Sequence, residues 1–262
     1  MRLFLAIALT MALAGPAAAQ QPTADWVFGA NGEDLVLEFG GGGKVRPSYE
    51  GADDYTVQPW PVVELHFLRL PFLGAIGGEP ESGISFAPSF RVVPDRDDDD
   101  HPELTGLDDI DLAVELGGTL SYRMGMLRPL VTVRHGFGGH EGIIGEVGLD
   151  FVAQPRPDLS VSLGPRLHFA DSEYLETYLG VTPAEELMSS FPAFDPDGGL
   201  KGAGVEGEAK YRLTPHWAIV GKASYEHLLG DAADSPITEE GSENQFTAAL
   251  GLTYRFGLDL FD

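Results

Sequence analysis

The chain has 262 residues, with no cysteine, 34 glycines and 19 prolines, and its 41 acidic and 16 basic residues give a formal net charge of −25. This charge argues against nucleic acid as a partner, because binding nucleic acid requires a basic surface. The lack of cysteine excludes disulfides, thiol nucleophiles and thiolate metal sites. The abundance of turn-forming residues favours one sizeable β domain.

The N-terminus has the organisation of a secretory signal. Arg2 precedes an apolar run over residues 3–13, and the alanines at 17–19 fit cleavage before Gln20. The apolar run is too short to cross a bilayer as a helix, and no later stretch approaches the roughly 20 apolar residues that a membrane helix needs. We therefore expect a signal peptide over residues 1–19, followed by a short N-terminal segment over residues 20–32.

Ten later runs alternate apolar and polar residues with a period of two, which predicts β-strands. Most of them have ten to fourteen residues, the length of a tilted membrane strand rather than of a strand in a soluble sheet. The predicted strands cover residues 33–45, 56–68, 83–93, 109–122, 127–137, 143–154, 159–169, 201–213, 216–228 and 244–256.

The last run shows the pattern most clearly. Phe246, Leu250 and Phe256 lie on one face, whereas Thr247 and Arg255 lie on the other. A face with an aliphatic centre and aromatic ends is typical of a strand that faces lipid in an outer-membrane barrel. With the secretory signal, this pattern predicts an all-β fold, a single antiparallel transmembrane β-barrel of about ten strands over residues 33–256, with a C-terminal extension over residues 257–262.

The connections between the predicted strands support this topology. Long loops over residues 94–108, 170–200 and 229–243 alternate with tight turns around residues 123–126, 155–158 and 214–215. These loops and residues 46–54 carry more than half of the 41 acidic residues. Because bacterial outer-membrane barrels have long external loops and short periplasmic turns, we expect an acidic outer rim. Twelve strands are the alternative count, since residues 72–76 have room for an extra strand.

The inward positions of the predicted strands carry charges of both signs in nearly equal number. This balance predicts a lumen closed by ion pairs, and a barrel of about ten strands is also narrow. The inward acidic residues are Glu38, Asp111, Glu115, Glu146, Asp150, Glu206, Glu208 and Glu226, and the basic residues are Arg91, Arg128, Arg134, Arg166, Lys210, Lys222 and Arg255.

Three prolines interrupt the predicted strands. Pro88, Pro129 and Pro165 each remove a ladder donor, which indicates a bulge or a strand end. Within the loop over residues 170–200, the run from Thr182 to Glu185 predicts the start of a short helix. Aromatic residues near the strand ends predict interfacial belts. These are Trp60, Trp217, Tyr122, Tyr211 and Tyr225.

Several motifs, taken in order, resemble those of the MipA/OmpV family, named for the MltA-interacting protein. They include Pro47-x-Tyr49-x-Gly51, Leu104-x-Gly106-Leu107-Asp108, Tyr178-x-Gly180-Val181-Thr182 and Leu213-Thr214-Pro215-His216-Trp217. The resemblance spans nearly all of the expected mature chain. It implies an outer-membrane barrel that scaffolds a lytic transglycosylase and a murein synthase, and it supplies no catalytic residues. Such barrels usually end on an aromatic residue, so either Phe256 or Phe261 is expected to serve as the assembly signal.

Candidate chemistry is sparse. The run from Asp95 to Asp100 lacks the glycine and the final glutamate of an EF-hand loop, so a solvated acidic loop is favoured over a calcium site. His135, His140 and Glu141 match no common zinc spacing. An acidic rim with His101 or His140 is the only basis for a hydrolytic site, and no G-x-S-x-G elbow is present. The sequence thus predicts no catalytic, cofactor-binding or metal-ligating residues.

Three functions compete on this evidence: a structural or scaffolding barrel of the cell envelope, a narrow solute pore and a barrel enzyme. The resemblance and the sparse chemistry favour the first, and the pore is the main alternative. The expected location is the bacterial outer membrane, reached through the periplasm. The expected partners are outer-membrane lipid and lipopolysaccharide, with a lytic transglycosylase and a murein synthase implied by the resemblance.

Overall fold

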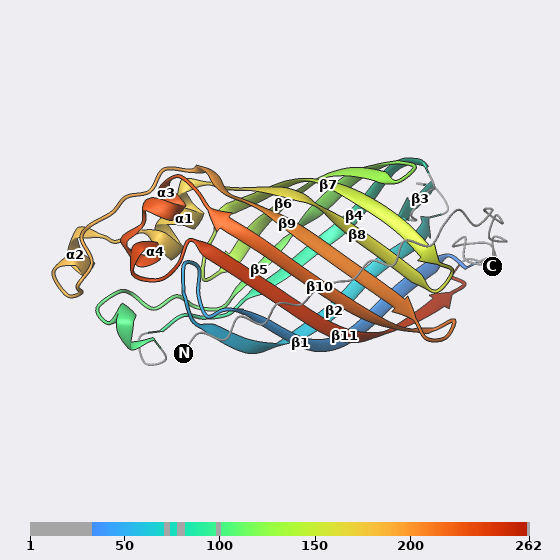
Figure 1. The fold of residues 1–262 in the computed structure, drawn as a ribbon, viewed down its shortest axis with the longest axis horizontal. Helices are drawn as coiled ribbons and strands as arrows, with labels where there is room; N and C mark the ends of the chain where they lie inside the picture. The colour runs from blue at the N-terminus through green and yellow to red at the C-terminus, as the bar shows by residue number, and fades with distance from the viewer. Residues whose placement is uncertain (1–32, 71–73, 78–81, 98–100, 261–262) are drawn as a thin grey trace.

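A computed structural model describes residues 33–70, 74–77, 82–97 and 101–260. Its eleven strands form one antiparallel sheet that curls into a barrel (Figure 1). Ten strands have 12 to 16 residues, whereas β3 has only 4. The strands are β1 (Leu35–Pro47), β2 (Tyr55–Leu70), β3 (Gly74–Gly77), β4 (Ser82–Val93), β5 (Ala113–Met124), β6 (Leu127–Gly138), β7 (Ile143–Arg156), β8 (Leu159–Ala170), β9 (Gly199–Arg212), β10 (Trp217–Leu228) and β11 (Asn244–Leu258).

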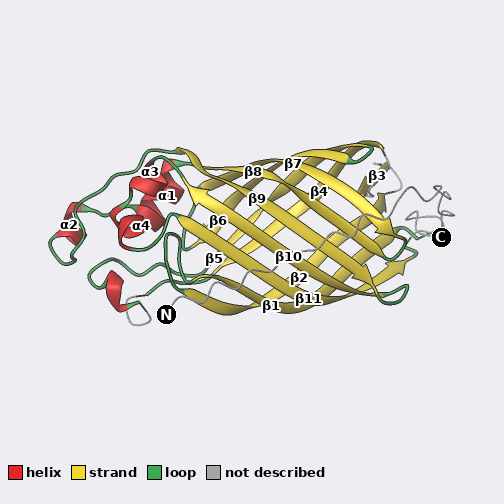
Figure 2. Cartoon of the chain, in the orientation of Figure 1, coloured by secondary structure: helices red, strands yellow, loops and turns green. Residues whose placement is uncertain are grey.

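All the helices lie at one end of the barrel, here called the cap end, and the tight strand connections lie at the other, the turn end (Figure 2). The helices are α1 (Ser172–Leu179), α2 (Pro183–Glu186), α3 (Asp231–Asp234) and α4 (Pro236–Glu240), with a short 3₁₀ helix at Pro102–Leu104. No helix in the described ranges is long and apolar enough to span a bilayer.

The predicted barrel fold is confirmed, and the ten predicted strands are the ten long strands. The extra strand proposed near residues 72–76 appears as β3, which pairs only with the end of β2. The barrel sheet therefore holds ten long strands and a short hairpin partner, not the twelve strands of the alternative count, within the described residues. Residues 1–32 and 261–262 lie outside the described residues, and with them the predicted cleavage site and Phe261.

One strand start was predicted wrongly. The run over residues 109–122 alternates throughout, yet β5 begins only at Ala113. Ile110 instead forms an isolated bridge with Arg96 and is buried among the loops at the cap end. Asp111, predicted to face the lumen, is exposed outside the strand. Similarly, β11 continues to Leu258, so part of the predicted C-terminal extension belongs to the barrel.

The barrel wall is apolar outside and polar inside. Leu250 is 63% exposed and Phe246 is 53% exposed, whereas Gln245 and Thr253 on the opposite face of β11 are buried. Because side chains alternate between the two faces of a strand, every second residue of each strand faces outward. The outward residues of β4 and β5 follow the same rule, with Ile84, Phe86, Leu116 and Leu120 exposed.

The prolines do not bulge the strands. Pro88, Pro129 and Pro165 remain in register with Gly118, Leu149 and Val205, and the ladders record no shift at these positions. The predicted bulges are therefore wrong. Pro88 lies on β4, which with β3 forms an edge of the sheet, and Pro is tolerated where no ladder donor is needed.

The glycine run of β1 allows a close approach of strands. A Cβ on Gly42 would collide with the carbonyl oxygen of Leu250 on β11, and one on Gly40 would collide with that of Leu252. Gly251 on β11 lies beneath the ring of Trp60, whose atoms would be 3.3 Å from an added Cβ. Glycine at these positions therefore makes room for an inward tryptophan on β2.

The hydrophobic core lies at the cap end, in the loops and the strand ends next to them. α1 begins with Asp171, whose side chain accepts a hydrogen bond from the Tyr174 amide (3.0 Å), and its buried face packs inward. The core continues into loops from three other connections, β1–β2, β4–β5 and β10–β11. It contains Tyr49, Ala52, Leu104, Leu107, Ile110, Tyr174, Leu175, Tyr178, Leu179, Val181, Phe191, Leu228, Ala232 and Ile237.

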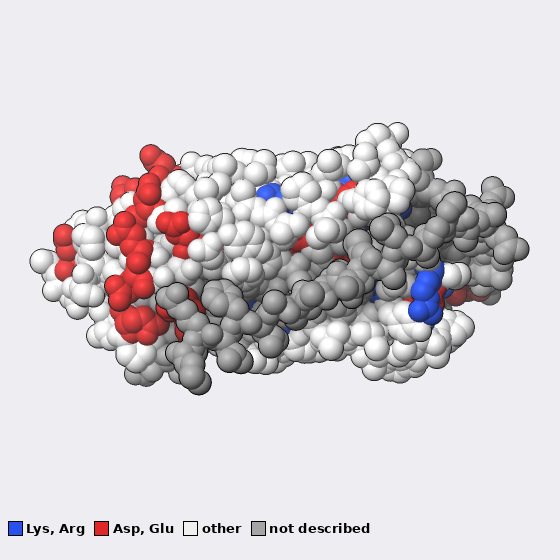
Figure 3. All heavy atoms as spheres, in the orientation of Figure 1, with Lys and Arg blue, Asp and Glu red and all other residues white. Residues whose placement is uncertain are grey.

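The outer surface of the cap is acidic, as predicted. Figure 3 shows acidic side chains gathered at the cap end, with few on the wall. Glu173, Glu176, Glu186, Glu239 and Glu240 are exposed there. The predicted helix start at Thr182 is confirmed, since Thr182 and Glu185 form a capping box at the start of α2.

Candidate functional site

Ion pairs cross the lumen in the half nearer the turn end. The Lys210 ammonium on β9 lies 2.7 Å from a Glu38 carboxylate oxygen on β1 and 3.0 Å from one of Glu64 on β2. Strand β9 is separated from β1 and β2 along the sheet by β10 and β11, so these contacts span the interior. Thr253 also donates a hydrogen bond to Glu38 (2.5 Å).

A second network lies on β6, β7, β8 and β9. Arg166 contacts Asp150 at 2.6 Å and Glu146 at 3.0 Å, and Arg128 shares Asp150 at 2.9 Å. The Arg166 guanidinium also lies 3.3 Å from a carboxylate oxygen of Glu206. Because a buried charge without a partner is costly, this arrangement keeps a nearly fully buried arginine and aspartate compatible with a low-dielectric interior.

A third network joins the wall to the cap. The side chain of Glu115 is 0% exposed and is held by Arg91 and by Arg134, whose Nε lies 3.0 Å from Oε2. His140 lies 3.5 Å from the same carboxylate and packs edge-on against the rings of Tyr174 and Tyr178 in the cap core. The polar lumen and the apolar cap therefore meet at His140.

The loop between β1 and β2 connects the cap to β9 through Glu50. Glu50 forms an ion pair with Lys201 and accepts a hydrogen bond from the Tyr174 hydroxyl (3.1 Å). Burial by itself raises the pKa of Glu50, but the Lys201 ammonium, with Arg91 and Arg46 nearby, outweighs burial and lowers the pKa below its usual value. Glu50 is thus ionised wherever the cap is folded at neutral pH.

The interior is divided into two parts. A chamber of about 380 Å³ lies beneath the cap and is lined by residues from Lys44 to Ala249. Toward the turn end are two adjoining cavities of about 200 and 290 Å³, which share Glu64, His66 and Arg123. The chamber shares no lining residue with either of them.

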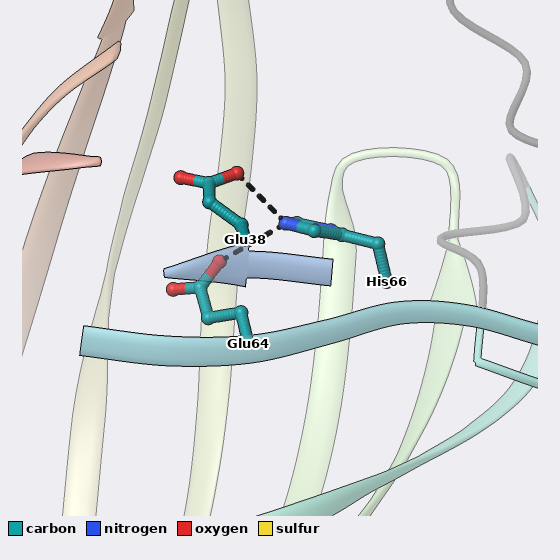
Figure 4. Close-up of side chains that lie close together, drawn as sticks. All are labelled: Glu38, Glu64 and His66. Carbon is teal, nitrogen blue, oxygen red and sulfur yellow. Dashed lines mark hydrogen bonds and ion pairs between the residues drawn. The ribbon is translucent and has the colours of Figure 1, made fainter. Parts of the chain in front are cut away.

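Glu38, Glu64 and His66 form a compact cluster in the turn-end compartment (Figure 4). The His66 Nε2 lies 2.9 Å from Glu38 and 3.3 Å from Glu64. Two carboxylates and an imidazole are suitable donors for a divalent metal. However, the Lys210 ammonium already contacts both carboxylates and supplies the positive charge that an ion would bring. The predicted absence of metal ligands remains a prediction.

Sequence reasoning missed this cluster, although a signal was present. Glu38 and Glu64 are directly opposed in the β1–β2 ladder, and His66 follows Glu64 on the same face. The register of the first hairpin would have placed all three together. The inward charges predicted from alternation are otherwise found as expected, with Asp111 as the exception described above.

The other residues considered for chemistry are not brought together. Asp95 is exposed and residues 98–100 lie outside the described residues. His135 is exposed and packs edge-on against Phe137, whereas His140 is buried and Glu141 is exposed. His101 packs against Tyr49. His140 is buried because it packs against Tyr174 and Tyr178 of the cap core.

One aromatic assignment is also wrong. Trp217 is exposed at the turn end and packs against Tyr254, as an interfacial residue would. Trp60 instead lies in the middle of β2 and lines the chamber beneath the cap. Trp60 and Glu64 are an even number of residues apart on β2, so alternation places both side chains on the inward face of the strand.

The sequence matches one protein family, and the fold is similar to several solved β-barrel structures. Similar solved structures include the NanC porin (8% identity, 84% of this chain and 98% of that chain covered, TM-score 0.39) and OprG of Pseudomonas aeruginosa (11%, 86% and 98%, TM-score 0.29). Neisserial surface protein A is similar at 11% identity, with 86% and 96% covered and a TM-score of 0.29. These values are too low to transfer any function.

No curated protein matches the sequence. Residues 39–256, which include all or most of every long strand, match the family described as MltA-interacting protein MipA. This match agrees with a barrel that is apolar outside and ion-paired inside. The chain belongs to the MipA family and is an outer-membrane β-barrel protein.

Proposed function

We propose that this chain is a closed, non-enzymatic scaffold of the outer membrane that tethers a murein-cleaving lytic transglycosylase to a murein synthase. The observation that carries the proposal is the Lys210 bridge to Glu38 and Glu64, which crosses the lumen between strands that are not neighbours. A lumen closed in this way favours an interaction role over transport. The family description, MltA-interacting protein, supports the choice of partner.

The separate compartments argue against the narrow pore as a function. A conducting path needs continuous space, whereas the chamber and the turn-end cavities have no lining residue in common. The cap core also fills the space between loops from several connections with buried apolar side chains. A wide, stable conductance is therefore not expected from this arrangement.

We assign the cap to the external face and the short turns to the periplasm, because outer-membrane barrels have this asymmetry. The apolar wall then contacts outer-membrane lipid, and the acidic cap rim lies beside lipopolysaccharide. Enzymes that act on murein work in the periplasm, so they would contact the turn end. The turns there expose Arg156 and Gly125.

The test is affinity capture from envelope extract with the tagged full-length protein. Mass spectrometry should identify both a lytic transglycosylase and a murein synthase. Arg156→Glu, at the turn end, should reduce their recovery, and Glu173→Lys, on the exposed face of α1, should leave it unchanged. Both substitutions are made at solvent-exposed positions, so both variants should fold. Heat-modifiable gel mobility should confirm that each barrel is intact.

Two results would refute the scaffold. One is capture that recovers neither murein enzyme. The other is capture that is lost in Glu173→Lys and kept in Arg156→Glu, which would move the partner to the opposite end of the barrel.

A further inference from the structure

The chamber beneath the cap is cationic although the chain is strongly acidic. The chain as a whole has a net charge of −25. The chamber is lined by more basic than acidic side chains. The basic residues are Lys44, Arg46, Arg91, Arg96, Arg134, Arg166, Lys201 and Lys222, and the acidic residues are Glu50, Asp95, Glu146, Glu206 and Glu226. Glu115 pairs with Arg91 and Arg134, and Asp150 pairs with Arg166, so the excess of positive charge is smaller than the lining alone gives. The remaining excess still creates a potential that attracts anions.

Most of the carboxylates lining the chamber are already used. Glu50 and Glu226 are paired with Lys201, and Glu206 is paired with Arg166 and Lys222. Glu146 is also paired with Arg166 (3.0 Å). Asp95 is exposed. The internal carboxylates therefore form ion pairs with cations of β8, β9 and β10, whereas none of them is within ion-pair distance of Lys44 or Arg46 on β1.

Lys44 and Arg46 have no carboxylate oxygen within ion-pair distance among the described residues. The Arg46 guanidinium donates only to the carbonyl oxygen of Pro47 (3.0 Å). Lys44 and Arg46 line the chamber together with Arg91 and Lys222. Partly buried cations that face one another are unfavourable unless an anion lies between them.

Trp60 adds a recognition surface to this charge. Its ring lines the same chamber and rests on Gly251, where an added Cβ would be 3.3 Å from the ring. Lys44 and Arg46 share the inward face of β1 with Gly42, which pairs with Trp60 in the β1–β2 ladder. Lys44 and Arg46, which form no ion pair among the described residues, can contact the charged group of an anion. The indole beside them can contact the organic part of a small organic anion, so the chamber can accept organic as well as inorganic anions.

We propose that the chamber beneath the cap binds a small anion that carries phosphate or carboxylate groups, with Lys44 and Arg46 as its charge partners and Trp60 beside it. The chamber volume of about 380 Å³ is within the range of small-molecule sites. This binding activity is separate from the scaffold role, because the site lies inside the barrel and the proposed partners bind outside it.

The chain has three tryptophans, so replacing Trp26 and Trp217 by phenylalanine leaves Trp60 as the only indole. In this full-length variant, refolded in detergent, inorganic phosphate and glucuronate should each produce a saturable change in fluorescence. Neutral glucose and magnesium chloride matched for ionic strength should not. The same two anions should raise the melting temperature of the parent protein, because a ligand that binds only the folded state stabilises it.

Lys44→Gln and Arg46→Gln should each weaken the apparent affinity for phosphate about ten-fold or more, as expected for loss of a charge-assisted hydrogen bond. Arg123→Gln is the matched control, since Arg123 lines only the turn-end cavities. Without an anion, Lys44→Gln should not lower the melting temperature, because Lys44 forms no ion pair among the described residues. This readout separates a binding defect from a folding defect.

The anion site would be refuted by the absence of a saturable response to both anions. It would also be refuted if Arg123→Gln weakened phosphate binding as much as Arg46→Gln. A lower melting temperature of Lys44→Gln in anion-free buffer would show that Lys44 has a protein partner, and that result too would overturn the proposal.

Discussion

The cap and the wall of this barrel are built on opposite rules. In the cap, Leu179 and Ile237 are completely buried and acidic side chains face outward, as in a water-soluble protein. In the wall, Leu250 and Val63 face outward, while Glu115 and Asp150 are buried. The difference follows from the solvent, because apolar groups leave water but remain exposed to lipid.

This contrast explains how one chain closes its own lumen. Ion pairs hold the interior of the wall, and a hydrophobic core holds the loops above it. The two regions are joined at a few points, chiefly the Glu50–Lys201 pair and the contact of His140 with Glu115. The cap should therefore be able to loosen without unfolding of the wall.

Truncation of the cap core gives the largest expected effect. Leu179→Ala removes a completely buried side chain and should destabilise the cap by about 2–5 kcal/mol. Limited proteolysis should then cleave the loops between β8 and β9 while heat-modifiable gel mobility still reports a folded barrel. Leu187→Ala, at an 86% exposed position in the same connection, is the control and should not increase cleavage. Loss of the folded barrel in Leu179→Ala would show that cap and wall are one unit.

A charge on the lipid face tests the other rule. Leu250→Arg should cost about 2–4 kcal/mol near the bilayer centre, as charged residues do on barrel walls. Ser121→Arg, on an inward position that lines the turn-end cavity, should cost much less. Refolding yields into lipid vesicles, measured by gel mobility, compare the two. Equal losses would mean that the inward and outward faces have been misassigned.

The junction between the regions should be sensitive to acid. Because the folded state lowers the pKa of Glu50, its ion pair with Lys201 contributes fully above the ordinary glutamate pKa of about 4.3. That contribution is lost as the pH falls below this value. Near-ultraviolet circular dichroism of the buried tyrosines, Tyr174 and Tyr178, should report loosening of the cap between about pH 5 and pH 2.

Glu50→Gln removes this ion pair and is the matched variant for the acid test. At neutral pH it should cost about 1.5–3 kcal/mol of cap stability, the range for a charged hydrogen bond. It should also flatten the acid transition, although other carboxylates still titrate. An acid transition of unchanged size and midpoint in Glu50→Gln would show that another group controls the cap.

The smallest effect is expected at the turn end. Arg156 and Asp158 form an ion pair (2.8 Å) in which the arginine side chain is 61% exposed. Exposed pairs of this kind contribute at most about 1 kcal/mol. Arg156→Gln should therefore leave the urea midpoint of the refolded protein nearly unchanged. A large decrease would indicate that the turn is part of the stabilising framework.

Much of the wall follows from the sequence, because lipid outside and charge inside impose a period of two on every strand. The face that contains Phe246 and Leu250 is an example. What alternation cannot give is which inward charges meet. Lys210 and Glu64 are 146 residues apart, and their contact depends on closure of the sheet. Alternation identifies which charged residues face inward, but it carries no information about which of them meet across the closed barrel.

The cap is less predictable because its loops follow no single period. Ile110 continues the alternation of the next strand, yet it packs into the core of the cap. The helical spacing of Tyr174, Leu175, Tyr178 and Leu179 is readable in the sequence, and it indicates an apolar face that needs a partner. The position of that partner is set by loops that are distant in sequence, so the core itself could not be inferred.

The most direct test of the closed barrel is single-channel recording in planar bilayers. The parent protein should show little or no steady conductance. Lys210→Ala, which removes the bridge across the lumen, should increase leak events, and Arg156→Ala at the exposed turn should not. Large, stable conductance steps from the parent protein would contradict the closed lumen and would favour the pore.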